Sequence, residues 1–171
     1  MIKFLSILTM MGFAAAAVAG APATGDGLLE KLAQGGITEV QAGKLALTKA
    51  TAPGIKAFAG MMVEDHSAAN EKVKALAATR SLTLPATPSE AQQETMKVLH
   101  AKSGPQFDQT YLAAQVKAHE ETVAMLKSEI ANGQDAATKS LARELLPTVE
   151  SHLKEAYRLA GTEERSAAVP Q

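Results

Sequence analysis

Apolar residues recur at helical spacing in four long segments of this chain, and no segment shows the alternating pattern of a β-strand. On one of these segments a single face collects residues at intervals of three or four: Phe58, Met62, His66, Ala69, Val73 and Leu76. Such intervals bring side chains together on one side of an α-helix, whereas a strand needs a period of two. We therefore expect an all-α fold.

Proline and glycine separate the helical segments, and the expected long helices cover about residues 26–50, 54–79, 106–131 and 135–159. The connection between the second and third helices, residues 80–104, has 25 residues and contains a short amphipathic helix. Antiparallel neighbours need only about two to eight residues. This favours a four-helix bundle with ferritin-like connectivity, in which the long connection carries the chain back along the bundle. An up-down-up-down bundle with a decorated loop is the alternative.

Irregularities are expected in the first and fourth helices. Asp26 is a candidate N-cap for the first helix. The pair Gly35 and Gly36 costs that helix about 2 kcal/mol relative to two alanines, which allows a local break. Pro147 removes a backbone donor within the fourth helix, so we expect a kink near Leu146.

Residues 1–19 have the parts of a secretory signal peptide: one lysine, an apolar run over residues 4–18 and a small-x-small triplet that ends at Ala19. The run is shorter than the roughly 20 residues that a membrane span needs, which argues against an uncleaved anchor. We expect cleavage near Ala19, one four-helix-bundle domain over residues 26–161 and a flexible tail over residues 162–171. The mature protein should be periplasmic or secreted, without a transmembrane segment.

Composition excludes several functions. Lys and Arg together number 17 against 18 Asp and Glu, and aromatic residues make up 4% of the chain, so nucleic acid is not an expected partner. The absence of cysteine excludes disulfide scaffolds, cysteine zinc sites and thiol chemistry. We find no serine nucleophile elbow, phosphate-binding glycine loop or pair of catalytic carboxylates. An enzyme is therefore the less favoured hypothesis.

The positions of the histidines are the feature that indicates a functional site. His66, His119 and His152 fall on the expected core-facing sides of three different helices. An imidazole buried in an apolar seam needs partners for its nitrogens, and three of them can share a metal ion. With Glu39 and Asp65 as additional carboxylates, the set suits zinc, iron or copper. The alternative is a structural polar layer in which each histidine is hydrogen-bonded to a neighbour. Along the helices, His152 lies five residues, or about 7.5 Å, from the level of His119.

One specific metal chemistry does not fit the spacing. A di-iron carboxylate site in a helical bundle needs Glu three residues before His on two helices. The residues at those positions are Val63, Val116 and Val149. A ferroxidase or oxygenase of that type is not expected.

Three stretches of the chain carry a family resemblance: ITEVQAGKLALTKATAPGIKAFAGMMVEDH, KAHEETVAMLKSEIANG and LLPTVESHLKEA. They contain Asp65 beside His66, His119 followed by Glu120, and Pro147 five residues before His152. In this order behind a signal peptide they resemble the bacterial exported proteins grouped as domain of unknown function 4142, often labelled putative outer membrane proteins. The resemblance covers about residues 26–159. It implies a ferritin-like helical bundle and no established activity, and the outer-membrane label implies at most peripheral envelope association.

The sequence thus predicts an exported binding protein of the ferritin-like type, with a metal site formed by the three core histidines and assisted by Glu39 and Asp65. The histidines would bind the ion through nitrogen, and the acids would balance charge or orient the rings. The competing hypothesis is a non-catalytic envelope or stress-associated interaction module whose histidines only hold the core together.

Overall fold

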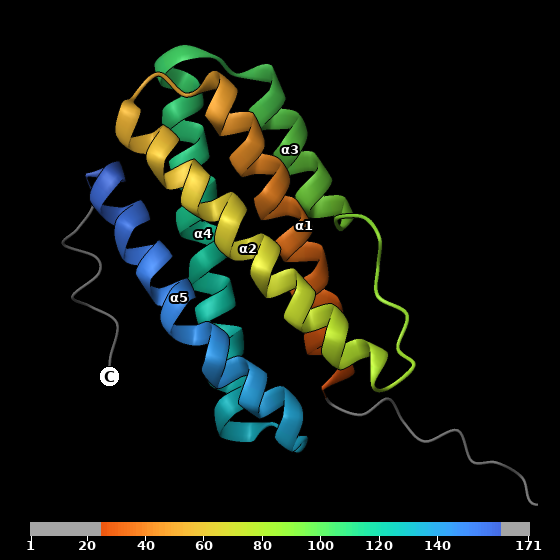
Figure 1. The fold of residues 1–171 in the computed structure, drawn as a ribbon. Helices are drawn as coiled ribbons and strands as arrows, with labels where there is room; N and C mark the ends of the chain where they lie inside the picture. Colours follow the sequence, from red (N-terminus) through yellow and green to blue (C-terminus); the bar gives the residue numbers. More distant parts are fainter. Residues whose placement is uncertain (1–24, 162–171) are drawn as a thin grey trace, which may run out of the picture.

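The structure is a computed structural model that describes residues 25–161 (Figure 1). The predicted signal peptide, 1–19, and the predicted tail, 162–171, lie outside the described residues. All regular secondary structure in the described range is helical, which confirms the all-α expectation. Its elements are α1 (Asp26–Lys49), α2 (Pro53–Ala78), α3 (Glu90–Ala101), α4 (Gly104–Asn132) and α5 (Ala136–Ala160).

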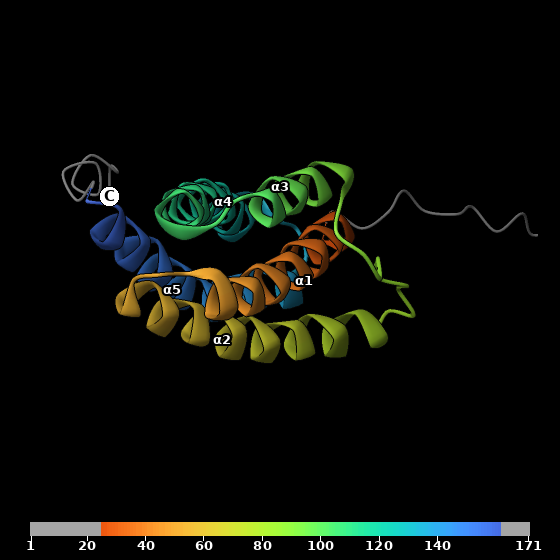
Figure 2. The same cartoon turned by 90° about the horizontal axis from the view of Figure 1, so that it is seen from above.

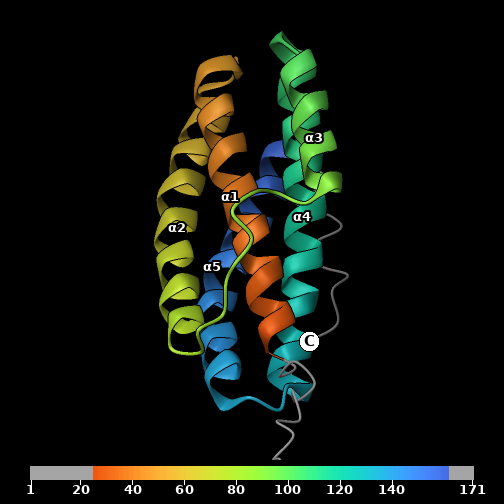
Figure 3. The same ribbon diagram turned by 90° about the vertical axis from the view of Figure 1, so that its right-hand side faces the viewer.

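The four long helices pair as two antiparallel hairpins, α1 with α2 and α4 with α5 (Figures 1 and 2). Helix α2 packs beside α5, and the short α3 lies along α1 and α4. The connection after α2 and then α3 carry the chain back along the molecule before α4 begins, as Figure 3 shows. As a result, α2 and α4 run in the same direction.

Two local expectations about the helices are wrong. The N-cap of α1 is Gly25, which makes no side-chain cap bond, and Asp26 is instead paired with Arg80 at 3.2 Å. Helix α1 also continues unbroken through its two glycines. A Cβ atom at Gly36 would lie 1.8 Å from the side-chain oxygen of Asn70 on α2, so the glycine leaves room for the Asn70 amide against α1. Packing against α2 offsets the poor helix propensity of this pair.

The other irregularities concern helix ends and Pro147. Ser89 caps α3 in a reciprocal capping box with Gln92, since each side chain bonds the backbone of the other. Helix α5 runs unbroken through Pro147, and the kink expected near Leu146 stays a prediction. The start of α2 is held by the buried carboxylate of Asp108, which accepts hydrogen bonds from the backbone nitrogens of Thr51 and Ala52.

The apolar core forms two clusters, one that includes Val73 and Val123 and another that includes Met62 and Leu112. On α2, position 66 falls between Met62 and Val73, and on α4, position 119 falls between Leu112 and Val123. The histidines predicted from the sequence therefore lie where one apolar cluster gives way to the other.

No helix within residues 25–161 combines the length and the apolar character needed to cross a membrane.

Candidate metal centre

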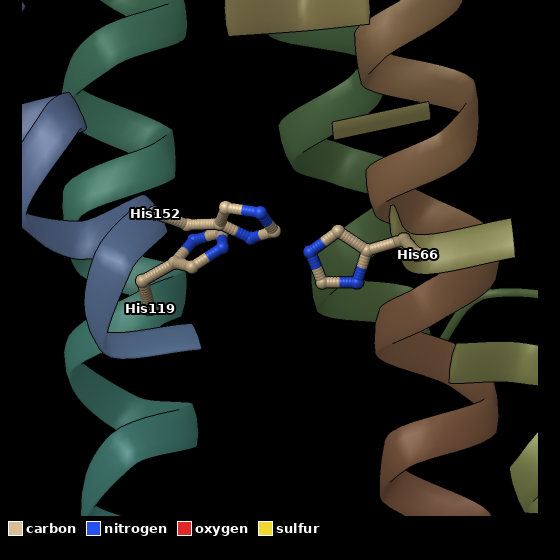
Figure 4. A group of neighbouring side chains, drawn as sticks. All are labelled: His66, His119 and His152. Atoms are coloured by element: carbon tan, nitrogen blue, oxygen red, sulfur yellow. The ribbon is translucent and has the colours of Figure 1, made fainter. Parts of the chain in front are cut away.

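Helices α2, α4 and α5 bring His66, His119 and His152 together (Figure 4). One ring nitrogen from each lies within 4.8 Å of the other two. The ring centroids are 5.5 Å apart for His66 and His119, 5.4 Å for His66 and His152, and 5.5 Å for His119 and His152. The three imidazoles thus form a nearly equilateral triangle, which we call the histidine triad.

The sequence predicts an offset along the helix axes between His119 and His152, and the directions of the two side chains compensate for it. Helical side chains lean toward the N-terminus of their own helix. Because α4 and α5 are antiparallel, His119 and His152 lean toward each other. His119 lies 13 residues before the end of α4 and His152 lies 16 residues after the start of α5, so the remaining offset is only about 4.5 Å.

Hydrogen bonds decide which nitrogen of two rings faces the centre. The Nδ1 of His119 lies 2.9 Å from the backbone oxygen of Gln115, and since a carbonyl only accepts, Nδ1 carries the proton and donates it. The Nε2 of His152 lies 2.8 Å from a carboxylate oxygen of Asp65 and donates in the same way. The remaining nitrogens, Nε2 of His119, Nδ1 of His152 and Nε2 of His66, are buried and have no hydrogen-bond partner within residues 25–161. Nε2 of His119 and Nδ1 of His152 therefore keep a free lone pair, and His66 offers one at Nε2 when its proton is on Nδ1.

Burial keeps the triad neutral. It lowers the pKa of His66 from 6.5 to about 3, helped by the two neighbouring rings, and lowers that of His119 to about 4 against the opposing bond to Gln115. Burial also lowers the pKa of His152, although the hydrogen bond to Asp65 acts the other way. At neutral pH all three rings are therefore uncharged, each with a single N–H, and a second proton does not compete with a metal ion for the other nitrogen.

The two predicted carboxylates take different places. Asp65 is next to the triad, bonded to the far nitrogen of His152. Glu39 is 6% exposed and accepts a hydrogen bond of 2.7 Å from the side-chain Nε2 of Gln115. Burial raises the pKa of Glu39 from 4.5 to about 7, although Gln115 and the nearby His152 lower it. Neither acid belongs to the group of mutually close ligand atoms, which within residues 25–161 consists of the three histidines.

Gln115 is the site residue that sequence reasoning missed. It is 2% exposed, its backbone oxygen orients His119 and its side chain holds Glu39. Its sequence signal is the spacing, because a residue four positions before a core histidine lies one turn away on the same helix face. Tyr111, a further turn back on α4, is also buried, and burial together with the charge of Glu39 raises the pKa of its hydroxyl.

A cavity of about 610 Å³ adjoins the triad. Side chains from all five helices line it, including the three histidines, Glu39, Asp65 and Gln115. Its walls are otherwise largely apolar, with Met96 and Leu99 of α3 on one side and Val73 and Leu145 on another. Helix α3, which the sequence placed in a connection, thus forms part of the wall of the site.

The chain matches the family described as "Domain of unknown function (DUF4142)" over residues 11–159. It belongs to this family. The resemblance found in the sequence is therefore confirmed, and the family description assigns no activity. No curated protein matches the chain.

Among solved structures, the DUF4142 chain is similar in fold to two described as CopM. It superposes on "CopM in the Cu(II)-bound form" with a TM-score of 0.68 at 15% identity, covering 80% of this chain and 95% of that one. For "CopM in the Cu(I)-bound form" the TM-score is 0.66 at 14% identity, with 79% and 94% covered. At these identities the likeness concerns the helical fold.

Proposed function

We propose that this protein binds one copper ion through His66, His119 and His152. The observation that carries the proposal is the convergence of three buried, unpartnered imidazole nitrogens from three helices. Leaving three such nitrogens without partners is costly, and a cation that takes a lone pair from each ring removes the cost. Around an ion with bonds of about 2.0 Å, ligand nitrogens lie roughly 3.3 Å apart, so small rotations of the rings complete the site.

Copper is the favoured ion among the three that the histidines suit. Divalent copper binds nitrogen sites more tightly than iron or zinc does, and imidazole is a good ligand for it. CopM, which has a similar fold, is described in Cu(II)-bound and Cu(I)-bound forms. The valines found where a di-iron site needs glutamates argue against iron. Zinc is the alternative that the metal measurement below separates.

The setting we propose for this function is the periplasm or the exterior of a bacterium. Residues 26–161 would form one ferritin-like four-helix-bundle domain, released by cleavage near Ala19 and free to associate peripherally with the envelope. Intact-mass measurement of the exported protein should give a chain that begins at Gly20. A chain that retains residues 1–19 would contradict this part of the proposal.

One observation favours a second candidate, a structural or interaction module without metal. His119 and His152 each already have one hydrogen-bond partner, in the backbone of Gln115 and in Asp65. In this alternative the triad only joins the helices, and no ion is required.

Metal analysis of protein exported and purified without chelator distinguishes the two. We expect about one copper per wild-type chain and almost none in His66→Ala, His119→Ala or His152→Ala. His100→Ala is the matched control, because His100 is exposed on α3 and outside the triad, and it should bind as wild type does. Copper at a free concentration of about 100 Kd should raise the melting temperature of wild type and control by about 5–10 °C.

Substoichiometric metal in the wild type, together with a melting temperature that added copper, zinc or iron does not change, would support the structural module. If the wild-type protein instead contained one zinc per chain, the histidine triad would still be the metal site, and the bound ion would be zinc and not copper.

A further inference from the structure

We propose that the ion held by the histidine triad has an exchangeable fourth ligand, a small hydrogen-bond donor such as water, which the side-chain oxygen of Gln115 holds in the adjoining cavity. This inference rests on the proposed function and adds to it an open coordination position. The site would then take a small exogenous ligand as well as the ion.

Residues 25–161 supply three ligands at this position. Within residues 25–161 the mutually close ligand atoms come from the three histidines, and Asp65 is already bonded to the far nitrogen of His152. Divalent copper and zinc take at least four ligands. The remaining position is therefore left for a ligand from outside residues 25–161.

Gln115 carries an unpartnered acceptor one helical turn from His119. Its Nε2 donates to Glu39 at 2.7 Å, which fixes the orientation of the amide and leaves Oε1 as the free end. This Oε1 is buried and has no hydrogen-bond partner within residues 25–161. Gln115 lies one turn from His119 on the same face of α4, and both line the cavity. A buried acceptor of this kind is satisfied by a ligand that donates a hydrogen bond.

The cavity provides room for such a ligand and a route for its exchange. Its volume of about 610 Å³ far exceeds the roughly 30 Å³ that one water molecule occupies in the liquid. Exposed residues, among them Lys31, Lys117 and Glu121, also line it, so it reaches the protein surface. The ion would thus be open on one side, in contrast to a closed structural site.

The chemistry of the lining selects the ligand class. A molecule that binds the ion and also donates a hydrogen bond, such as water, ammonia, an alcohol or a peroxide, can satisfy the ion and Gln115 together. An anion without a donor, such as azide, can only displace the water and leaves Oε1 unpartnered again.

The test uses the full mature chain loaded with one equivalent of Cu(II). An exchangeable water on the ion should speed the relaxation of bulk water protons, and azide should abolish this effect while an azide-to-copper charge-transfer band appears. Gln115→Leu removes the acceptor that holds the water, so azide should bind about fivefold more tightly. The control is Thr122→Val on the same helix, where the hydroxyl is already bonded to the backbone oxygen of Ala118 at 2.8 Å and azide affinity should not change.

Wild-type protein that holds one copper but shows no azide band and no azide-sensitive relaxation would overturn this inference and leave the proposed function intact. So would an azide affinity of Gln115→Leu equal to that of Thr122→Val. Wild-type protein that takes up no copper would overturn both proposals, and the stoichiometry measured before the azide titration shows which case holds.

Discussion

Asp65 holds His152 by Nε2 and so leaves Nδ1 as the nitrogen that faces the other two rings. Gln115 does the same for His119 through its backbone oxygen, with the opposite nitrogen free. Such contacts fix the tautomer and the orientation of a ligand before the ion arrives, and a carboxylate partner also makes the ring a stronger base. The triad therefore depends on residues that do not belong to the ligand set.

Replacing Asp65 by asparagine keeps a hydrogen-bond acceptor for His152 and removes the negative charge of the carboxylate. We expect copper affinity, measured by competition with a chelator, to fall about tenfold. Glu64→Gln is the matched control, because the neighbouring Glu64 is exposed on α2 and loses the same charge. Equal affinities in the two variants would show that Asp65 does not orient a ligand.

Acid should destabilise the metal-free protein. The unfolded chain binds protons on histidine near pH 6.5, whereas the folded pKa is about 3 for His66 and about 4 for His119. Between those values the unfolded state holds more protons than the folded state. Each unit by which the pH is lowered therefore reduces the free energy of unfolding by about 1.4 kcal/mol for each ring. Glu39 acts in the opposite sense, because its folded pKa is about 7 against 4.5 unfolded and folding takes up a proton in that range.

Urea unfolding at pH 7 and pH 5 measures this balance. Wild type should be less stable at pH 5, because the lowered histidine pKa values outweigh the single raised one. The loss should be smaller in His66→Leu and larger in Glu39→Gln, which lacks the compensating proton. If all three proteins lost the same free energy, the triad would not be the origin of the acid sensitivity.

At the scale of elements, glycine sets how closely α1 approaches α2. A Cβ atom at Gly43 would lie 2.8 Å from Cγ2 of Val63 and 3.0 Å from the backbone oxygen of Ala59. Backbone atoms cannot move aside as a flexible side chain can. This contact lies in the hairpin that carries Glu39 and His66.

Gly43→Ala should lower the free energy of unfolding by about 1–3 kcal/mol, because the two helices must separate to admit the methyl group. Gly60→Ala is the control on α2, where an added Cβ meets nothing within 4 Å. It should raise stability by up to about 1 kcal/mol through better helix propensity. Denaturant unfolding of the two variants checks both signs, and stabilisation by Gly43→Ala would contradict the close contact.

At the scale of the whole molecule, Arg80 connects three helices at one end. It follows α2 and pairs with Asp26, the first residue of α1, and with Asp135, the N-cap of α5. The Arg80 side chain is 17% exposed, so its charge is only partly screened by solvent. Two of these helices, α2 and α5, carry His66 and His152, so the relative placement of these two ligands depends on how the helix ends are held.

Arg80→Ala should lower the free energy of unfolding by about 2 kcal/mol, since it leaves two partly buried carboxylates without their cation. Lys74→Ala breaks an exposed pair with Glu71 and should change stability by less than about 0.5 kcal/mol. Thermal and urea unfolding compare the two. A loss in Arg80→Ala no larger than in Lys74→Ala would show that this cluster contributes little.

Much of the candidate site could be predicted because its signals are local. The spacing of apolar residues places His66, His119 and His152 on inward faces, and period, proline and glycine locate the helices to within a few residues. The bond from Gln115 to Glu39 joins residues 76 positions apart, and the bond from His152 to Asp65 joins residues 87 apart. No local pattern specifies such pairs.

The sequence alone determined the helical class, the helix boundaries within a few residues and the family, because helix formation depends on neighbours three or four positions away. Only the tertiary structure decided that the rings of His152 and His119 meet, that α1 stays continuous through Gly35 and Gly36, and that α3 forms one wall of the cavity. These outcomes depend on how closely the helices approach and on which way their side chains lean, and packing between distant segments sets both.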